Sequence, residues 1–167
     1  MKNKNFVFCF ALILFILSAC ESTEEGYRLY EDKSRDYSFE VPASWQQASI
    51  QNNDIAFVNS DQTMLLAVKT MDAQNDLSSY VDLMKTNIPT VLSGGVLLGE
   101  EKMNIADRNS HKLVVSYHSG NTNFKYALVM IEDKDKNRLL MFTYTTLLKE
   151  YERNYDIFQH VLNTLEF

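Results

Sequence analysis

The sequence is short of several residue types, and each shortage excludes a class of protein. Only two cysteines occur among 167 residues, so the chain is not a disulfide-rich scaffold. Two prolines and five glycines leave no Pro/Gly-rich linker, and no internal repeat recurs at a fixed period. The 16 basic residues are outnumbered by 22 acidic residues, which gives a net charge of −6. This balance argues against nucleic acid as a partner, because nucleic acid requires a basic surface.

Long hydrophobic runs are also scarce, apart from one near the N-terminus, where residues 1–19 have the features of a secretory signal peptide. Lys2 and Lys4 supply positive charge, and an apolar core extends from Phe6 to Leu17. This core is too short for a membrane helix, which needs roughly 20 residues to cross the hydrocarbon. We therefore predict that residues 1–19 are removed.

The run Leu17-Ser18-Ala19-Cys20 follows this core directly. It resembles the lipobox of bacterial lipoproteins, whose cysteine receives a diacylglyceryl thioether and becomes the mature N-terminus. The resemblance implies that Cys20 is lipidated, and two or three acyl chains are enough for stable attachment to a membrane. An ordinary secretory signal that happens to contain a cysteine is the alternative. No disulfide is expected in either case, because Cys9 lies in the segment that is removed.

The mature chain would contain 148 residues (167 − 19), enough for one domain with its own core. It would keep 14 basic and 22 acidic residues, so the net charge would become 14 − 22 = −8. We predict that residues 20–29 form the lipidated N-terminus and a tether, because Glu21 to Gly26 is short, acidic and polar. Residues 30–167 are then expected to form one folded domain.

Alternation of apolar and polar residues predicts several strands in this domain. The expected strands are Tyr37–Val41, Ile55–Asn59, Met64–Thr70, Val96–Ile105, Lys112–Tyr117, Phe124–Glu132 and Arg138–Thr145. The second and third should form an antiparallel hairpin, and the last three should form a meander. We expect Asp107-Arg108-Asn109 to form the turn that precedes this meander.

The strand Phe124–Glu132 is apolar on both of its faces, since Phe124, Tyr126, Leu128 and Met130 alternate with Ala127, Val129 and Ile131. An antiparallel sheet with such a strand needs a layer above it and a layer below it. Two amphipathic helices are available, Leu77–Ile88 with Asp76 as its N-cap, and Leu148–Leu165. Pro89 is expected to stop or kink the first helix. The sequence therefore predicts an α+β fold in which an antiparallel β-sheet is sandwiched between helices.

The first expected strand and the residues after it resemble the opening of PsbP-like domains. The residues that carry the resemblance are Tyr37-Ser38-Phe39-Glu40-Val41-Pro42-Ala43-Ser44-Trp45. The ending is also similar, with a double-sided strand, a charged turn, another strand and a long helix that closes on Phe167. The resemblance covers about Tyr30 to Phe167. It implies the fold of the photosystem II PsbP subunit and of the yeast Ran-binding import factor, and it implies no established enzyme class and no metal ligands.

The metal-binding patterns in the sequence are incomplete. Asp133-Lys134-Asp135-Lys136-Asn137 imitates the start of a calcium-binding loop, but Arg138 stands where glycine is required and Tyr144 stands where glutamate is required. Asp107 and His111 have a metal-like spacing, yet no third ligand is nearby in the sequence. We therefore predict no metal site and no cofactor.

Catalytic patterns are missing as well. The possible imidazole bases are His111, His118 and His160, and no serine lies in a nucleophile elbow. Glu100 and Glu101 are adjacent in an expected strand, so their carboxylates should point to opposite faces. We predict that the chain is not an enzyme.

Trp45 follows a proline at the end of a strand, where an indole can either plug the core or stand at a protein interface, and we favour the plug. The polar residues that follow it could then form an exposed interaction surface. We single out Gln47, Asn53 and Asp54 as the hypothetical contact residues.

We predict that the chain is a membrane-anchored envelope lipoprotein, held on the extracytoplasmic side of a bacterial membrane, whose domain is a non-catalytic protein-binding or assembly module. Its partners would be the membrane, through the lipid, and an unidentified envelope protein. A small-ligand or metal-binding lipoprotein that serves a transporter is the alternative, and it requires a deep pocket. A hydrolase is a third possibility, which requires a histidine to meet Ser, Asp or Glu in a cleft.

Overall fold

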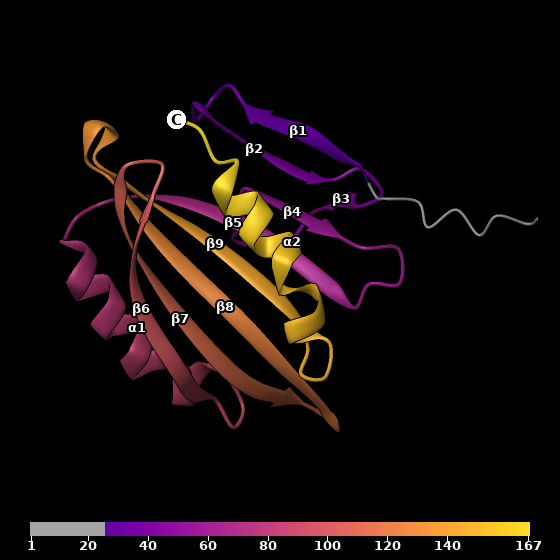
Figure 1. Ribbon diagram of the computed structural model, residues 1–167. Helices are drawn as coiled ribbons and strands as arrows, with labels where there is room; N and C mark the ends of the chain where they lie inside the picture. The colour runs from indigo at the N-terminus through magenta and orange to yellow at the C-terminus, as the bar shows by residue number, and fades with distance from the viewer. Residues whose placement is uncertain (1–25) are drawn as a thin grey trace, which may run out of the picture.

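The structure is a computed structural model, and it describes residues 26–167 (Figure 1). The predicted signal peptide (1–19), Cys20 and most of the predicted tether lie outside the described residues. The first strand starts at Tyr27, so folded structure begins three residues before the expected domain boundary at residue 30. Tyr27–Asp32 belongs to the domain because it pairs with the next strand along its whole length and Tyr30 packs against the core.

Nine strands, two α-helices and one short 3₁₀ helix make up the described chain. Their bounds are β1 Tyr27–Asp32, β2 Tyr37–Pro42, β3 Gln46–Ala48, β4 Ile55–Val58, β5 Met64–Asp72, α1 Leu77–Val91, β6 Val96–Ile105, β7 Arg108–Ser119, β8 Thr122–Asp133, η1 Lys134–Lys136, β9 Arg138–Leu147 and α2 Tyr151–Asn163. The expected α+β class and all seven expected strands are confirmed. Strands β1 and β3 were not predicted, since β1 begins inside the expected tether and β3 has only three residues.

Seven strands form one antiparallel sheet in the order β3-β4-β5-β9-β8-β7-β6. The expected β4–β5 hairpin and the meander that ends in β9 are both present. Pairing of β5 with β9 joins these two units, in a register that runs from Met64 opposite Thr146 to Asp72 opposite Arg138. The last strand of the chain therefore lies in the middle of the sheet.

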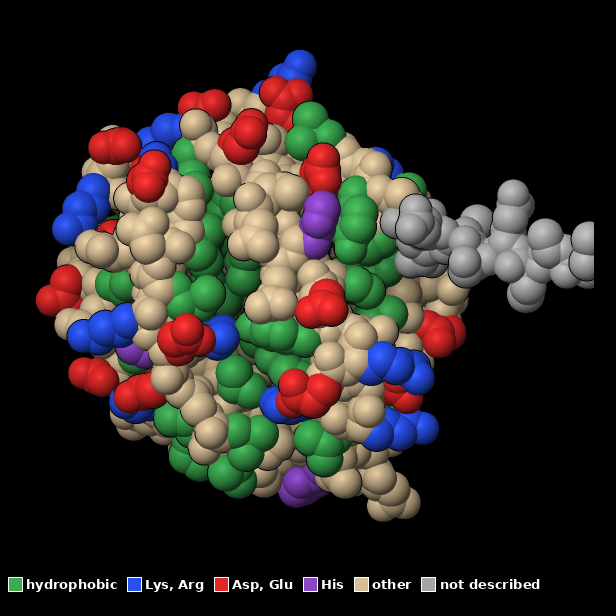
Figure 2. Space-filling model, viewed as in Figure 1, with side chains coloured by type: hydrophobic (Ala, Val, Ile, Leu, Met, Phe, Trp, Pro, Cys, Tyr) green, Lys and Arg blue, Asp and Glu red, His purple; other side chains and the backbone are tan. Residues whose placement is uncertain are grey.

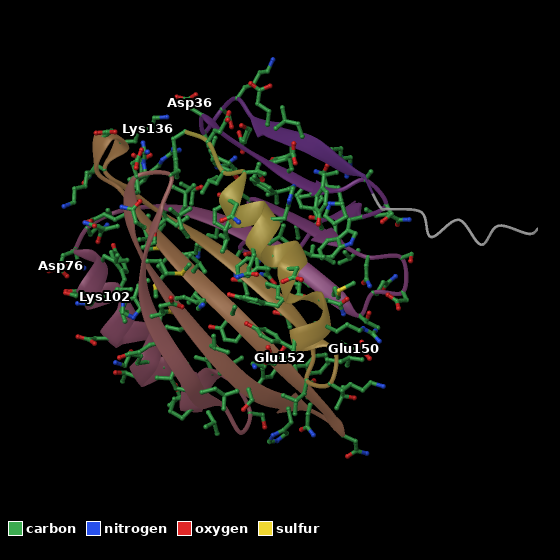
Figure 3. All side chains as sticks on the ribbon, in the orientation of Figure 1. Asp36, Asp76, Lys102, Lys136, Glu150 and Glu152 are labelled. Atoms are coloured by element: carbon green, nitrogen blue, oxygen red, sulfur yellow. The ribbon has the colours of Figure 1, made fainter. Side chains whose placement is uncertain are left out.

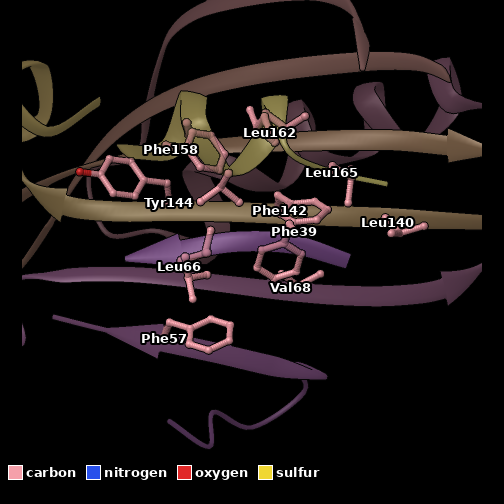
Figure 4. Close-up of a cluster of buried hydrophobic side chains, with 14 of the residues drawn as sticks. Phe39, Phe57, Leu66, Val68, Leu140, Phe142, Tyr144, Phe158, Leu162 and Leu165 are labelled. Atoms are coloured by element: carbon pink, nitrogen blue, oxygen red, sulfur yellow. The ribbon is translucent and has the colours of Figure 1, made fainter. Parts of the chain in front are cut away.

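The two faces of the sheet carry separate hydrophobic cores. Phe142 and Tyr144 of β9 enter the larger core together with Phe158 of α2, as Figure 4 shows. Leu139 and Met141 of the same strand face the opposite way and pack with α1. Strand β8 alternates in the same manner, so the predicted double-sided strands and the sandwich of helices are confirmed.

The two faces are covered unequally. On one face α2 lies beside the separate β1–β2 hairpin, and the two are joined where the backbone groups of Ser38 and Glu166 exchange hydrogen bonds (Figure 1). Trp45 is only 2% exposed and packs in this larger core, which confirms the expected plug. On the other face α1 packs over β6, β7 and β8, and no other described helix or strand lies on that face.

Two local expectations need correction. Of the stop or kink expected at Pro89, the stop is wrong, because helix α1 continues to Val91 and a proline in the last turn costs the helix only one backbone donor. The turn between β6 and β7 is formed by Ala106 and Asp107, both with positive φ, as a two-residue hairpin requires, and Arg108 already belongs to β7. The N-cap at Asp76 is confirmed by a hydrogen bond that the backbone N–H of Ser79 donates to its carboxylate at 2.8 Å.

Because β9 lies in the centre of the sheet, a cavity in its side-chain packing should strongly lower the free energy of unfolding. We expect Phe142→Ala, at a fully buried position, to lower the free energy of unfolding by about 3–5 kcal/mol, as measured by urea denaturation. Leu148→Ala is the control, and at a position 44% exposed it should change stability by less than about 0.5 kcal/mol. Equal effects of the two substitutions would contradict the placement of β9 in the core.

Candidate functional site

One end of the sheet is held together by charged side chains. The carboxylate of Asp133 is fully buried and accepts hydrogen bonds from Nε of Arg138 at 2.7 Å and from Nε of Arg108 at 3.2 Å. The same Arg138 donates to the backbone oxygens of Arg35 and Asp36. Burial alone would raise the pKa of Asp133, but the two guanidinium groups outweigh it and hold the pKa below its ordinary value. We call this region the charged end.

A second ion-pair network extends the charged end to the β1–β2 turn. Arg35 donates to Asp32 at 2.9 Å and to Asp54 at 3.1 Å. Asp54 also accepts the backbone N–H of Thr70 at 2.6 Å, which ties the loop before β4 to strand β5. Asp36 and Lys136, which form another ion pair here, are labelled near the top of Figure 3. Protein groups already engage all three nitrogens of the Arg138 guanidinium, so this network has a structural role.

The opposite end of the sheet exposes aliphatic side chains. Val91 is 73% exposed, Val96 is 54% exposed, and Leu98 is 52% exposed. The register places the start of β6, the β7–β8 turn and the end of β9 at this end, and Leu148 lies beside the same turn through a hydrogen bond from its backbone N–H to Asn123. We call Val91, Val96, Leu98 and Leu148 the apolar end. Figure 2 shows hydrophobic side chains gathered at this lower end of the molecule.

A cleft of about 570 Å³ opens between α1 and the sheet. Its lining is mainly aliphatic and aromatic, with two amides and two threonine hydroxyls, and none of the lining residues is charged. These residues are Asn53, Met84, Asn87, Ile88, Val91, Leu92, Tyr117, Tyr126, Thr143 and Thr145. The cleft exists because α1 covers only part of its face of the sheet, and no other helix of residues 26–167 lies beside it on the side that faces β9. We call it the α1 cleft.

The turn after α1 fixes the helix against the sheet at the rim of this cleft. The backbone N–H of His118 donates to the carbonyl of Ser93 at 3.0 Å, and the Ser93 hydroxyl contacts Nε2 of His118 at 2.9 Å. A Cβ atom at Gly95 would lie 2.6 Å from the carbonyl oxygen of Ile88, so only glycine allows this close approach. The rim of the cleft is therefore built into the fold.

The predicted interaction residues do not gather at one surface. Gln47 is exposed on edge strand β3, Asn53 lines the α1 cleft, and Asp54 belongs to the charged end. Their role in binding stays a prediction, and so does the lipidation of Cys20, which lies outside the described residues. Sequence reasoning missed Val91 and Leu92 of the cleft because Pro89 was expected to end the helix. Val91 and Leu92 follow Ile88 at the helical spacing of three and four residues, so extending the apolar periodicity of the helix past Pro89 would have identified them.

Within residues 26–167 the three histidines lie apart from one another: Nε2 of His160 contacts a carboxylate oxygen of Glu40 at 2.7 Å, and Nε2 of His111 lies 3.9 Å from a carboxylate oxygen of Glu100. The Ser93–His118 contact is exposed in a turn, and within residues 26–167 no carboxylate bonds to that imidazole to orient it. The carboxylates of Glu100 and Glu101 pair with Lys85 and Lys112 on opposite faces. Across the described residues, no three His, Cys, Asp or Glu side chains are grouped as metal ligands. No described helix is both long enough and apolar enough to cross a membrane.

Solved structures with this arrangement define the class of fold. CyanoP, the PsbP of the cyanobacterium Synechocystis, superposes with a TM-score of 0.66 at 15% identity, over 90% of this chain and 98% of its own. The Ran-binding protein Mog1p of Saccharomyces cerevisiae gives a TM-score of 0.61 at 10% identity, over 85% of this chain and 95% of its own. LpqN of Mycobacterium tuberculosis, involved in cell envelope biogenesis, gives 0.61 at 11% identity, over 87% of this chain and 86% of its own. The domain is therefore PsbP-like.

The chain belongs to the DcrB family, whose sequence model matches residues 37–164. The match begins at β2, so it includes the whole seven-stranded sheet and both helices. None of the curated proteins matches the sequence. The expected PsbP-like fold is confirmed, and the family is DcrB.

The close packing at the cleft rim predicts that Gly95 cannot be replaced. We expect Gly95→Ala to lower the free energy of unfolding by about 1–3 kcal/mol, because the new methyl group would press on the last turn of α1. Gly99→Ala is the matched control. A Cβ atom at Gly99 would have no atom within 4 Å apart from its two chain neighbours, so this substitution should change the free energy of unfolding by less than about 1 kcal/mol. Thermal or urea unfolding of both variants measures the difference, and a stable Gly95→Ala protein would contradict the contact.

The buried carboxylate at the charged end predicts a pH-dependent loss of stability. Because the folded-state pKa of Asp133 is lowered, its contribution is present above the unfolded-state value of about 4 and is lost as the pH falls further. We expect Asp133→Asn to cost about 3 kcal/mol at pH 7 and progressively less below pH of about 4, as measured by urea unfolding at several pH values. Asp107→Asn, at an exposed turn, should show neither effect. A pH-independent difference for Asp133→Asn would contradict the charged network.

Proposed function

We propose that this DcrB-family chain is a membrane-anchored envelope lipoprotein and that its domain is a non-catalytic protein-binding module. The observation that carries the binding role is the apolar end, where four aliphatic side chains are exposed at the edge of an otherwise well-packed domain. Contiguous exposed apolar surface on a monomer is typical of protein contact sites, and Val96 and Leu98 are two residues apart on edge strand β6. The partner would be an envelope protein that covers Val96 and Leu98.

Several features support the choice of partner and location. The lipobox-like run that ends at Cys20 supports an anchor on the extracytoplasmic side of a membrane. One structural neighbour is described as Ran-binding and another as involved in cell envelope biogenesis, which fits a protein-binding role in an envelope. The lack of convergent acid, base and nucleophile groups at the cleft and at the apolar end supports a role without catalysis.

Leu98 offers a direct test of the binding role. We expect Leu98→Asp to reduce recovery of the partner by about tenfold or more, in a pull-down from detergent-solubilised membranes, because a charge would replace a desolvated aliphatic contact. Leu29→Asp is the matched control, since Leu29 is 64% exposed on β1 and lies away from the apolar end. Recovery that is unchanged by Leu98→Asp, or equally reduced by both substitutions, would overturn the proposal.

The anchor is tested separately. We expect Cys20→Ala to remove the lipid and to move the protein from the membrane fraction to the soluble fraction, as followed by fractionation and mass spectrometry of the intact protein. Native protein recovered in the soluble fraction with an unmodified Cys20 would contradict the anchor. This outcome would not change the interpretation of the Leu98→Asp pull-down, which tests the protein contact.

A further inference from the structure

The α1 cleft has the size and chemistry of a site for a small ligand, and it is distinct from the apolar end except at Val91. Its volume of about 570 Å³ falls in the range of roughly 300–1,000 Å³ that ligand sites occupy. Side chains from α1, β7, β8, β9 and the loop before β4 meet in its walls. The contacts of Ser93 and Gly95 hold α1 in place, so the cleft does not depend on a ligand to form.

The lining of the cleft carries no charge, although the described chain around it is rich in ion pairs. The amide of Asn87 and the hydroxyls of Thr143 and Thr145 form no hydrogen bond with another group of residues 26–167. The hydroxyls of Tyr117 and Tyr126 are protonated at neutral pH, as the ordinary tyrosine pKa of about 10 requires, and burial raises the pKa of both further, that of Tyr126 to about 12. The cleft therefore offers apolar walls and neutral hydrogen-bonding groups, and it offers no counter-ion.

We propose that the α1 cleft binds a ligand with an alkyl chain and an uncharged polar head. The alkyl chain lies against Met84, Ile88 and Leu92, which supply aliphatic surface that is removed from water on binding. The head group meets the free amide and hydroxyl groups. A carboxylate or ammonium head would have to leave water without gaining an opposite charge, which is costly. This ligand site is additional to the proposed protein-binding role and does not rest on it.

The experiment compares two probes of ten carbons each, 1-decanol with a neutral hydroxyl head and decanoate with a charged carboxylate head, both added to the folded domain at pH 8. We expect 1-decanol to bind and decanoate to bind at least about tenfold more weakly, as measured by isothermal titration calorimetry. Equal binding of both probes, or no binding of 1-decanol, would overturn the proposal. An apolar peptide added in excess should fail to displace bound 1-decanol, and this result would support the alkyl site. Binding of the peptide to a protein that does not bind 1-decanol would contradict the alkyl site.

Substitutions locate the site and separate it from the protein contact. We expect Asn87→Asp, which adds a charge to the lining without changing the shape of the side chain, to weaken 1-decanol binding by about tenfold or more. Asn87→Leu removes the amide but keeps the lining neutral, so it should weaken binding less than Asn87→Asp does. Asn121→Asp adds the same charge in the exposed β7–β8 turn and should have no effect, and Leu98→Asp should have none either. Loss of binding in the two control variants, or its persistence in Asn87→Asp, would place the alkyl site elsewhere and overturn the assignment.

Discussion

Pairing between β5 and β9 is the constraint on which the rest of this structure depends. It joins the hairpin of β4 and β5 to the meander of β6 to β9, across the whole length of helix α1 in the sequence. This pairing places β9 in the centre, so that Leu139 and Met141 face one core while Phe142 and Tyr144 face the other. A strand that is apolar on both sides is stable only when both faces of the sheet are covered. Helices α1 and α2 meet this requirement.

The two faces of the sheet are covered differently, and the α1 cleft results from this difference. The face that carries α2 is completed by the β1–β2 hairpin, and the larger core lies beneath them (Figure 4). The face that carries α1 has no second element among the described residues, so a neutral cleft remains beside the helix. Along the strands, ion pairs around Asp133 close one end of the sheet, while Val96 and Leu98 leave the other end apolar. The described molecule therefore has one end closed by ion pairs and one end that exposes aliphatic side chains.

Much of this fold could be predicted from periodicity alone. The alternation in Phe124–Glu132 predicted two covered faces, and Asp76 predicted the start of α1, because both signals are local and strong. Strand β1 could not be predicted from its own sequence, since its polar residues pair only because Tyr30 reaches the core of a folded sheet. The continuation of α1 past Pro89 was missed for a similar reason, since packing of Ile88 on the sheet outweighs the lost hydrogen bond.

The candidate sites were harder to predict than the fold. The α1 cleft is assembled from residues far apart in the sequence, such as Asn53, Tyr117 and Thr143, and none of them forms a motif. Of the three residues expected at an interaction surface, Asn53 alone lines the cleft, and Asp54 is held in an ion pair with Arg35. A surface defined by incomplete covering is a property of the tertiary structure. It becomes visible only when the positions of both helices are known.

Photo-crosslinking in cells shows whether the apolar end contacts another envelope protein. A photoreactive phenylalanine analogue would replace Val96 at the apolar end in one variant and Lys33, in the β1–β2 turn, in the other. We expect a defined crosslinked species of higher mass from position 96 and none from position 33. A crosslink from position 33 alone, or no crosslink from position 96 in membranes that contain the folded protein, would contradict it.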